Sequence, residues 1–178
     1  TSDSITNNGL VNLAYKESGA TVEYRINDGS WFSTSGSSIN VTGDDGVKTV
    51  IVRQTDVAGN SSVTSSLVFT LDTTAPSAPV SAYLTNDTGI SASDRITNDA
   101  VLRVPGVEDG AALEYSMDGG DNWVSAPVYT GTGVISTDWI ENNNLLIRQI
   151  DTAGNISDSA SFSFTLDTSA PQALELSL

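Results

Sequence analysis

Carboxylate and amide side chains crowd the polar segments of this 178-residue sequence and are its main candidates for chemistry. The phrase Asp-x-Ala-Gly-Asn occurs at 56–60 and 151–155, and Leu-Asp-Thr-(Thr/Ser)-Ala-Pro occurs at 71–76 and 166–171. A longer polar segment, 86–99, carries three further aspartates. Ca²⁺ takes roughly six to eight oxygen ligands of these kinds. The segments therefore predict binding of a hard cation. The structural alternative is that each Asp side chain only caps its own turn.

Composition removes several other kinds of chemistry. The chain has no His and no Cys, which removes the commonest general base, Ser-His-Asp catalysis and the usual zinc sites. The net charge of −15 argues against nucleic acid and anionic membranes as partners. No apolar run approaches the length of a membrane span. Paired carboxylates can act as a general acid and a general base. Here they recur at the predicted junctions between repeated domains, and a repeat seldom duplicates an active site at every junction, so we expect no enzyme.

The sequence is internally duplicated. Residues 2–8 return as 93–99 at an offset of 91, and residues 52–60 return as 147–155 at an offset of 95. The period is that of a complete small domain, which predicts one domain at 1–74 and another at 75–178. The first copy lacks a counterpart of the lead-in and first strand of the second. The second copy carries four extra residues near Trp139, and this insert is a candidate for an exposed surface.

Short alternating runs separated by Gly, Asn and Asp predict an all-β fold, and helix signals are absent. The period favours two tandem immunoglobulin-like β-sandwich domains in an extended arrangement. Strands are expected at 10–15, 21–26, 48–54 and 65–71 in the first copy. In the second copy they are expected at 79–84, 100–105, 112–117, within 123–136, at 144–150 and at 160–166.

Some side chains fit a structural role. Residues 116–123 match the Ser-x-Asp-x-Gly-x-x-Trp pattern of the Asp-box hairpin, which stabilises a turn and is not catalytic. Arg53 and Arg148 are expected to pair with Glu23 and Glu114 across a sheet. A larger set is expected in solvated loops, namely Asp44, Asp45 and Asp138. The aromatic set expected to anchor the cores is Tyr24, Trp31, Tyr115 and Trp123.

Three phrases resemble bacterial Ig-like repeats of giant surface adhesins, including RTX-type adhesins of biofilms and host attachment. They are Val-Arg-Gln-Thr-Asp-x-Ala-Gly-Asn, Phe-Thr-Leu-Asp-Thr-Thr-Ala-Pro and Asp-Thr-Gly-x-Ser-x-Ser-Asp-x-Ile-Thr-Asn-Asp. The resemblance covers the whole chain twice. It implies a stalk of many such domains on the bacterial cell surface, stiffened by Ca²⁺ between domains. The first copy departs from the third phrase, since Asn8 stands where the second copy has Asp99.

If the strands of each sandwich run alternately up and down, acidic loops gather at the facing ends of adjacent copies. Mutual repulsion there would be relieved by Ca²⁺. The densest cluster is expected in the 86–99 segment. The predicted ligands are Asp3, Asp72, Asp87, Asp94, Asp99, Glu108, Asp109, Asp151, Asn155 and Asp167.

The sequence therefore predicts a secreted, monomeric stalk segment whose partners are neighbouring repeats of the same polypeptide. A binding module that grips a glycan or host protein, through the insert at 128–139, is the main alternative. An accessory sandwich of a secreted hydrolase is a weaker one. A spacer should respond to Ca²⁺ and bind no glycan, while a binding module should be retained on a glycan array.

Overall fold

The computed structural model describes residues 3–136 and 143–178, and all of its regular elements are β-strands. The predictions for Asp138 and Trp139 lie outside these residues. The chain folds as two compact units: unit 1 holds residues 1–74 with 152–155, and unit 2 holds 75–151 with 156–178. The described residues include no helix long and apolar enough to cross a membrane.

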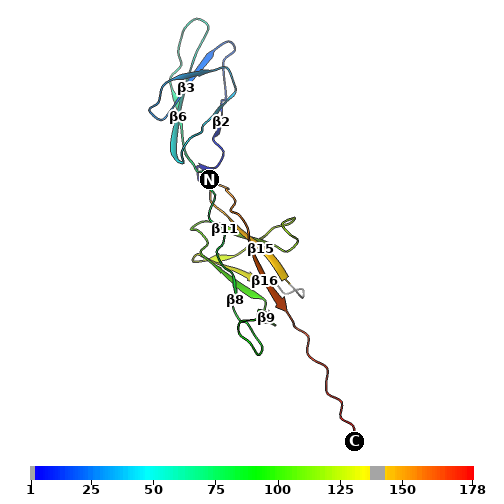
Figure 1. Ribbon diagram of the computed structural model, residues 1–178. Helices are drawn as coiled ribbons and strands as arrows, with labels where there is room; N and C mark the ends of the chain where they lie inside the picture. The colour runs from blue at the N-terminus through cyan, green and yellow to red at the C-terminus, as the bar shows by residue number, and fades with distance from the viewer. Residues whose placement is uncertain (1–2, 137–142) are drawn as a thin grey trace. The chain divides into compact units, whose positions relative to one another are not determined.

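Unit 1 contains two sheets that enclose a small core (Figure 1). The larger sheet has the order β1-β7-β6-β3-β4, and the smaller one pairs β2 with β5. The strands of the larger sheet are β1 (Ile5–Thr6), β3 (Thr21–Ile26), β4 (Phe32–Thr34), β6 (Gly46–Thr55) and β7 (Ser65–Leu71). The strands of the smaller sheet are β2 (Leu10–Asn12) and β5 (Ser38–Asn40).

Unit 2 repeats this plan and adds strands. Its larger sheet has the order β12-β11-β15-β16-β9, and its smaller sheet has the order β13-β14-β10-β8. The larger sheet is built from β9 (Ile96–Thr97), β11 (Ala112–Ser116), β12 (Val124–Ala126), β15 (Asn143–Ile150) and β16 (Ala160–Leu166). The smaller sheet is built from β8 (Tyr83–Leu84), β10 (Val101–Pro105), β13 (Val128–Tyr129) and β14 (Thr132–Ser136).

The all-β, Ig-like sandwich architecture is confirmed. Two mainly antiparallel sheets bury alternating side chains between them in each unit. Strand β10 shows the pattern clearly, since Leu102 and Val104 are fully buried while their strand neighbours are half-buried. Four short strands escaped the sequence analysis: β4 and β5 of unit 1, and β1 and β9. In each unit a two-residue strand, β1 or β9, pairs in parallel with the last strand, β7 or β16.

The cores of the two units differ in extent. Unit 2 buries a continuous set that runs from Leu84 through Leu113 to Leu166. Unit 1 buries a smaller set centred on Ile39, Val50 and Leu71, with half-buried side chains around it. The predicted aromatic anchors divide: Tyr115 is buried and Tyr24 packs against the core, but Trp31 and Trp123 are only half-buried. The prediction of core positions for the two tryptophans was therefore wrong.

Candidate functional site

The loop of residues 86–99 in unit 2, called here the 86–99 loop, holds the carboxylate with the most unusual surroundings. Asp87 Oδ2 accepts a hydrogen bond from the backbone N–H of Arg95 at 3.0 Å. Its other oxygen, Oδ1, is buried and has no hydrogen-bond partner. A buried, unpartnered carboxylate oxygen is costly, so among the described residues this atom is the best candidate to bind a cation or a water molecule.

Hydroxyl and amide groups fix the shape of the 86–99 loop. The Thr97 hydroxyl, which is almost completely buried, donates to the Asn86 carbonyl at 2.8 Å. The Asn86 side-chain amide donates to Asp99 Oδ2 at 2.6 Å. Asp94 Oδ1 accepts the Ile96 N–H at 3.0 Å. Of the three aspartates in the loop, Asp94 and Asp99 therefore use a carboxylate oxygen in local bonds, and Asp87 alone has an oxygen that is both buried and unpartnered.

A shallow cavity of about 180 Å³ opens beside Asp87. Strand β8 lines one side of it, and Arg95 and Phe162 line the other. The guanidinium of Arg95 lies 4.9 Å from the centre of the Phe162 ring. The cavity therefore has one carboxylate to attract a cation and one guanidinium to oppose it, which predicts weak binding at most.

Three other predicted ligands cap turns. Asp3 Oδ1 accepts the Ile5 N–H at 3.1 Å, Asp72 Oδ1 accepts the Thr74 N–H at 3.2 Å, and Asp167 Oδ1 accepts the Ser169 N–H at 2.9 Å. Each bond spans two residues, the usual geometry of an Asx turn. The turn-capping alternative is thus observed at these positions, although a capping carboxylate still has one oxygen to offer.

At the other end of unit 2, Glu108 is tied to the incoming chain. Its Oε1 accepts the Ser77 N–H at 3.1 Å, while its own N–H donates to Gln149 Oε1 at 2.9 Å. Gln149 is almost completely buried and donates in turn to the Ser77 carbonyl at 2.6 Å. Asp109 lies beside Glu108, exposed, in the turn before β11. This group locks the start of unit 2 by hydrogen bonds and needs no ion to do so.

The last two predicted ligands belong to the segment after β15. Asp151 is half-buried at the end of that strand. Residues 152–155 group with unit 1, where the Asn155 amide donates to the Asp72 carbonyl at 2.8 Å and the Ala153 carbonyl accepts the Asn7 N–H at 3.2 Å. Asn155 therefore acts as a hydrogen-bond donor there.

No group of three or more acidic side chains stands close enough to hold a metal ion within residues 3–136 and 143–178. The structure thus spreads the ten predicted ligands over several loops. The Ca²⁺ site stays a prediction, and the unpartnered oxygen of Asp87 is the observation that best fits it.

Asp45 lies exposed in a loop, as the sequence predicts, but it also has a structural role that the sequence analysis missed. Its carboxylate accepts hydrogen bonds from the Thr73 N–H at 2.7 Å, the Thr73 hydroxyl at 2.8 Å and the Thr74 hydroxyl. The Thr74 hydroxyl, followed by the Thr73 groups, lowers the pKa of Asp45 below its usual value. The Asp45 side chain therefore fixes the chain as it leaves β7, a role for which the sequence carries no local signal.

The predicted Arg–Glu pairs are confirmed, and in each pair the arginine stacks on a tryptophan ring. In unit 2, Arg148 bonds Glu114 at 2.8 Å and lies 3.8 Å from the Trp123 ring centre. In unit 1, Arg53 bonds Glu23 at 2.8 Å and lies 4.5 Å from the Trp31 ring centre. Cation–π stacking explains why both tryptophans remain at the sheet surface. This repeated trio is structural.

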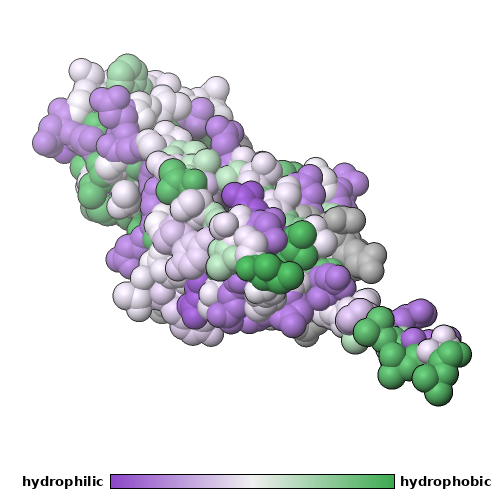
Figure 2. Space-filling view, turned by 60° about the horizontal axis from the view of Figure 1, so that its bottom comes forward, coloured by the Kyte–Doolittle hydropathy of each residue, from purple (hydrophilic) through white to green (hydrophobic). Residues whose placement is uncertain are grey.

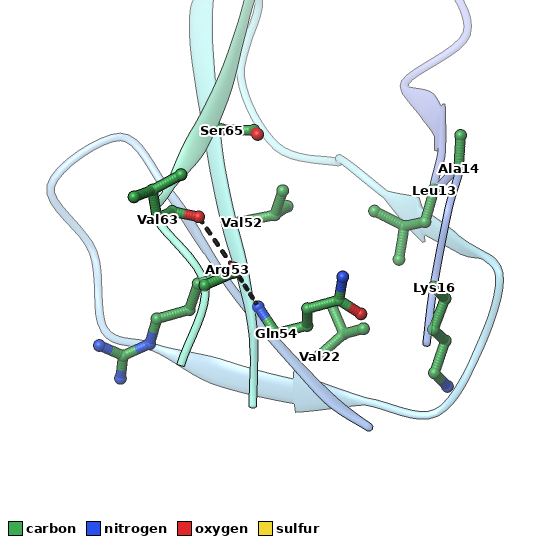
Figure 3. A pocket seen from close by; sticks show the side chains of 10 residues that line it. Leu13, Ala14, Lys16, Val22, Val52, Arg53, Gln54, Val63 and Ser65 are labelled. Atoms are coloured by element: carbon green, nitrogen blue, oxygen red, sulfur yellow. Dashed lines mark hydrogen bonds between the residues drawn. The ribbon is translucent and has the colours of Figure 1, made fainter. Parts of the chain in front are cut away.

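A pocket of about 110 Å³ lies in unit 1 between Leu13, Val22 and Val52 (Figure 3). Its polar groups are already engaged, since the Gln54 N–H donates to the Ser62 hydroxyl at 3.1 Å and Arg53 pairs with Glu23. Lys16 lies on the opposite side, and its ammonium donates to the Ser35 carbonyl at 2.8 Å. The pocket offers no carboxylate or hydroxyl beside a free base, so it supports no catalytic interpretation.

Comparison with known protein families shows to which family the chain belongs. The bacterial Ig-like domain family matches residues 74–168, just over half of the chain. The chain belongs to the bacterial Ig-like domain family. The match confirms the Ig-like part of the resemblance and leaves the adhesin context open.

Among curated proteins no sequence matches this bacterial Ig-like chain. Among solved structures, the chain is similar to SGBP-B of a mixed-linkage glucan utilization locus of Bacteroides ovatus, solved with a mixed-linkage heptasaccharide. The identity is 17%, the TM-score is 0.31, and the match covers 92% of this chain but only 42% of that one. This chain therefore spans less than half the length of SGBP-B, and a similarity this weak carries no argument about a ligand.

Proposed function

We propose that the chain is a spacer segment of the stalk of a secreted bacterial surface adhesin, and that Ca²⁺ bound to its acidic loops stiffens it. The observation that carries the proposal is the duplication of a whole framework. Both units repeat the two-residue strand that pairs in parallel with the last strand, and both repeat the Arg–Glu–Trp trio. The duplicated features are therefore ones that stabilise the fold, which is what a structural spacer requires.

The Ca²⁺ part of the proposal rests on the 86–99 loop. Asp87 Oδ1 would be the first ligand, with Asp99, backbone carbonyls of the loop and water completing the shell. A bound Ca²⁺ supplies positive charge that removes the cost of the unpartnered oxygen and cross-links the loop. With only one buried, unpartnered carboxylate oxygen in the loop and Arg95 nearby, the Ca²⁺ affinity should fall in the weak range of extracellular modules, about millimolar.

Thermal melting of the full chain with Ca²⁺, and then with excess chelator, tests this part. For a millimolar Kd, about 10 mM Ca²⁺ should raise the melting temperature of unit 2 by about 5 °C. Asp87→Asn should abolish that rise, because it removes the charge at the unpartnered atom. Asp158→Asn, an exposed acid outside the predicted ligand set, is the matched control and should keep the rise.

Two results would contradict the proposal in different ways. An equal response of wild type and Asp87→Asn would remove the 86–99 loop as the site. If the maximum dimension of the chain in small-angle X-ray scattering is the same in Ca²⁺ and in chelator, Ca²⁺ does not stiffen the chain. Specific retention on a glycan array would instead favour the binding-module alternative over a spacer.

A further inference from the structure

The outer face of the larger sheet of unit 1 carries an arginine that unit 2 lacks. Arg25 of β3 stands where the repeat offset of 91 places Ser116 in unit 2. Arg53 of β6 pairs with Glu23, two positions before Arg25 on β3, so the two arginines are diagonal neighbours on adjacent strands. The guanidinium of Arg25 lies 5.4 Å from the ring centre of Trp31, and that of Arg53 lies 4.5 Å from it. The Arg–Glu–Trp trio of unit 1 therefore has a second cation.

Arg25 has no carboxylate to balance it. Glu23 bonds Arg53 at 2.8 Å. In the part of the chain that the structure describes, the guanidinium of Arg25 has no hydrogen bond and no ion pair, and its Nε is buried without a partner. The Ser116 hydroxyl of unit 2 takes part in two hydrogen bonds of the 116–123 turn, at 2.7 Å and 2.9 Å. Unit 1 therefore has an unsatisfied charged donor, which is costly, where unit 2 has a satisfied hydroxyl.

Apolar side chains lie beside Arg25 on the same face. Ile51 lies directly opposite it on β6 and is half-buried, and Val68 of β7 is 55% exposed. The counterpart of Val68 in unit 2 is Ser163, which is also exposed although unit 2 has the additional strand β8. This face is therefore open in both copies, but unit 1 presents an unpaired guanidinium and a valine where unit 2 presents two serines.

The charge around Trp31 has the opposite sign to that of the chain. The net charge is −15, and hydrophilic residues, drawn in purple, are spread over the face seen in Figure 2. At Trp31, two guanidiniums stand against one carboxylate, that of Glu23. The next acid along the chain, Asp28, is exposed and forms no ion pair with Arg25. Salt at about 0.15 M screens remote acids beyond about 8 Å, so this place can attract one negative charge.

We propose that Arg25 and Trp31 form a binding site for a carboxylate, which a partner polypeptide presents as an acidic side chain. A planar guanidinium donates two parallel N–H bonds to a carboxylate, and of the three guanidinium nitrogens of Arg25 only Nε is buried. Stacking on Trp31 uses the face of the guanidinium and leaves its N–H edge for the ligand. The bound carboxylate neutralises the charge that Glu23 leaves unpaired.

Charge and the apolar neighbours select this ligand. A phosphate group, with a charge of about −1.5 to −2, exceeds one unpaired guanidinium and is repelled more strongly by the acidic chain. Val68 and Ile51 favour a polypeptide over a free acid, because they can contact an apolar residue beside the acidic one. Trp and Arg are among the residues that dominate binding at protein interfaces. The expected partner segment is therefore an acidic residue flanked by apolar ones.

Nuclear magnetic resonance of the full chain tests the site through the indole N–H signal of Trp31, which is assigned by its loss in Trp31→Phe. The probe is a blocked Val-Glu-Val tripeptide, and a blocked Val-Gln-Val tripeptide is its neutral control. The Glu peptide should shift the signal saturably with a Kd of about 1 mM, and the Gln peptide should not. The proposal does not rest on Ca²⁺ or on the spacer role, and the titration is run in chelator, so its failure says nothing about either.

Three variants assign the binding to Arg25. Arg25→Ser matches the unit 2 position and should weaken binding of the Glu peptide at least about tenfold. Arg25→Lys keeps the charge but loses the planar fork, so its affinity should fall between those of Arg25→Ser and wild type. Arg103→Ser, on β10 of unit 2, makes the same change in net charge and should bind as wild type does.

Four results would overturn the proposal. Equal shifts with the Glu and Gln peptides, or equal affinities of wild type and Arg25→Ser, would remove the carboxylate site. Acetate or inorganic phosphate that binds as tightly as the Glu peptide would remove the polypeptide as the ligand. A mass in light scattering that rises above 18.5 kDa with concentration in wild type, but not in Arg25→Ser, would make a second copy the partner instead.

Discussion

The Asp118 carboxylate accepts three hydrogen bonds within one turn. It closes the turn between β11 and β12 by accepting the Asn122 N–H at 2.9 Å, the Asn122 amide at 2.6 Å and the Ser116 hydroxyl at 2.7 Å. Trp123 completes the turn by donating to the Gly120 carbonyl at 2.9 Å. This is the geometry that the Asp-box pattern predicts, and its chemistry is structural.

The bonds to Asp118, led by the Asn122 N–H, lower its pKa from 3.8 to about 2. Because the folded pKa lies below the unfolded one, the carboxylate contributes stability above about pH 4 and loses it as pH falls toward about 2. Asp118→Asn should therefore lower the melting temperature of unit 2 at about pH 7, and the difference from wild type should shrink as the pH falls from about 4 toward about 2. Scanning calorimetry across this range measures it, with Asp121→Asn in the same turn as a control that should differ little. A difference that stays constant between about pH 4 and about pH 2 would contradict the assignment.

Single residues also mark the limit of sequence reasoning. The pairs of Arg53 with Glu23 and Arg148 with Glu114 were predictable because strand pairing brings fixed positions into register. The hydrogen bonds of Asp45 could not be predicted, because its partners Thr73 and Thr74 are distant in sequence and reach it only once β7 has folded. The unpartnered oxygen of Asp87 follows from three-dimensional packing, so the sequence marked its loop but could not select the atom.

At the scale of elements, alternation and duplication predicted the long strands closely. The expected strands at 21–26, 65–71 and 160–166 coincide with β3, β7 and β16. Strands β1 and β9 have two residues each, too few to show a period, and their parallel pairing has no hairpin turn to announce it. The expected strand at 79–84 is reduced to β8 at 83–84, and Ser77, which precedes the expected strand, bonds Glu108 and Gln149.

Strand β14 contains an element-scale constraint at Gly133. This glycine pairs with Val104 and faces Leu113, and a Cβ added to it would fall on the Leu113 side chain, which is fully buried. Gly133→Ala should therefore destabilise unit 2 by about 2 kcal/mol through overpacking. Gly36→Ala is the control, since its added Cβ would meet ordinary contacts of 3.4 Å or more. Denaturant melts give both values.

A second-site variant tests the cause at Gly133. If the clash with Leu113 is responsible, Gly133→Ala should cost clearly less in a Leu113→Ala background than in wild type, because the two sites are in contact and couple. Additive costs would show that the effect arises elsewhere in β14.

At the scale of the whole molecule, two units with separate cores should differ in stability. Among the described residues, the core of unit 2 holds fourteen buried side chains and that of unit 1 holds five. No strand among the described residues covers Val11 and Leu67 of unit 1 in the way that β8 covers the core of unit 2. Buried apolar area is the main source of stability, so unit 1 should unfold first.

Calorimetry of the full chain should therefore resolve two transitions, with unit 1 in the lower one. Val50 and Leu145 occupy equivalent positions in β6 and β15 and are 2% and 0% exposed. Val50→Ala should cost about 2 kcal/mol and shift only the lower transition, while Leu145→Ala should cost about 3 kcal/mol and shift only the upper one. A single transition that both variants shift equally would show that the two units unfold together, and the order inferred from their cores would then be wrong.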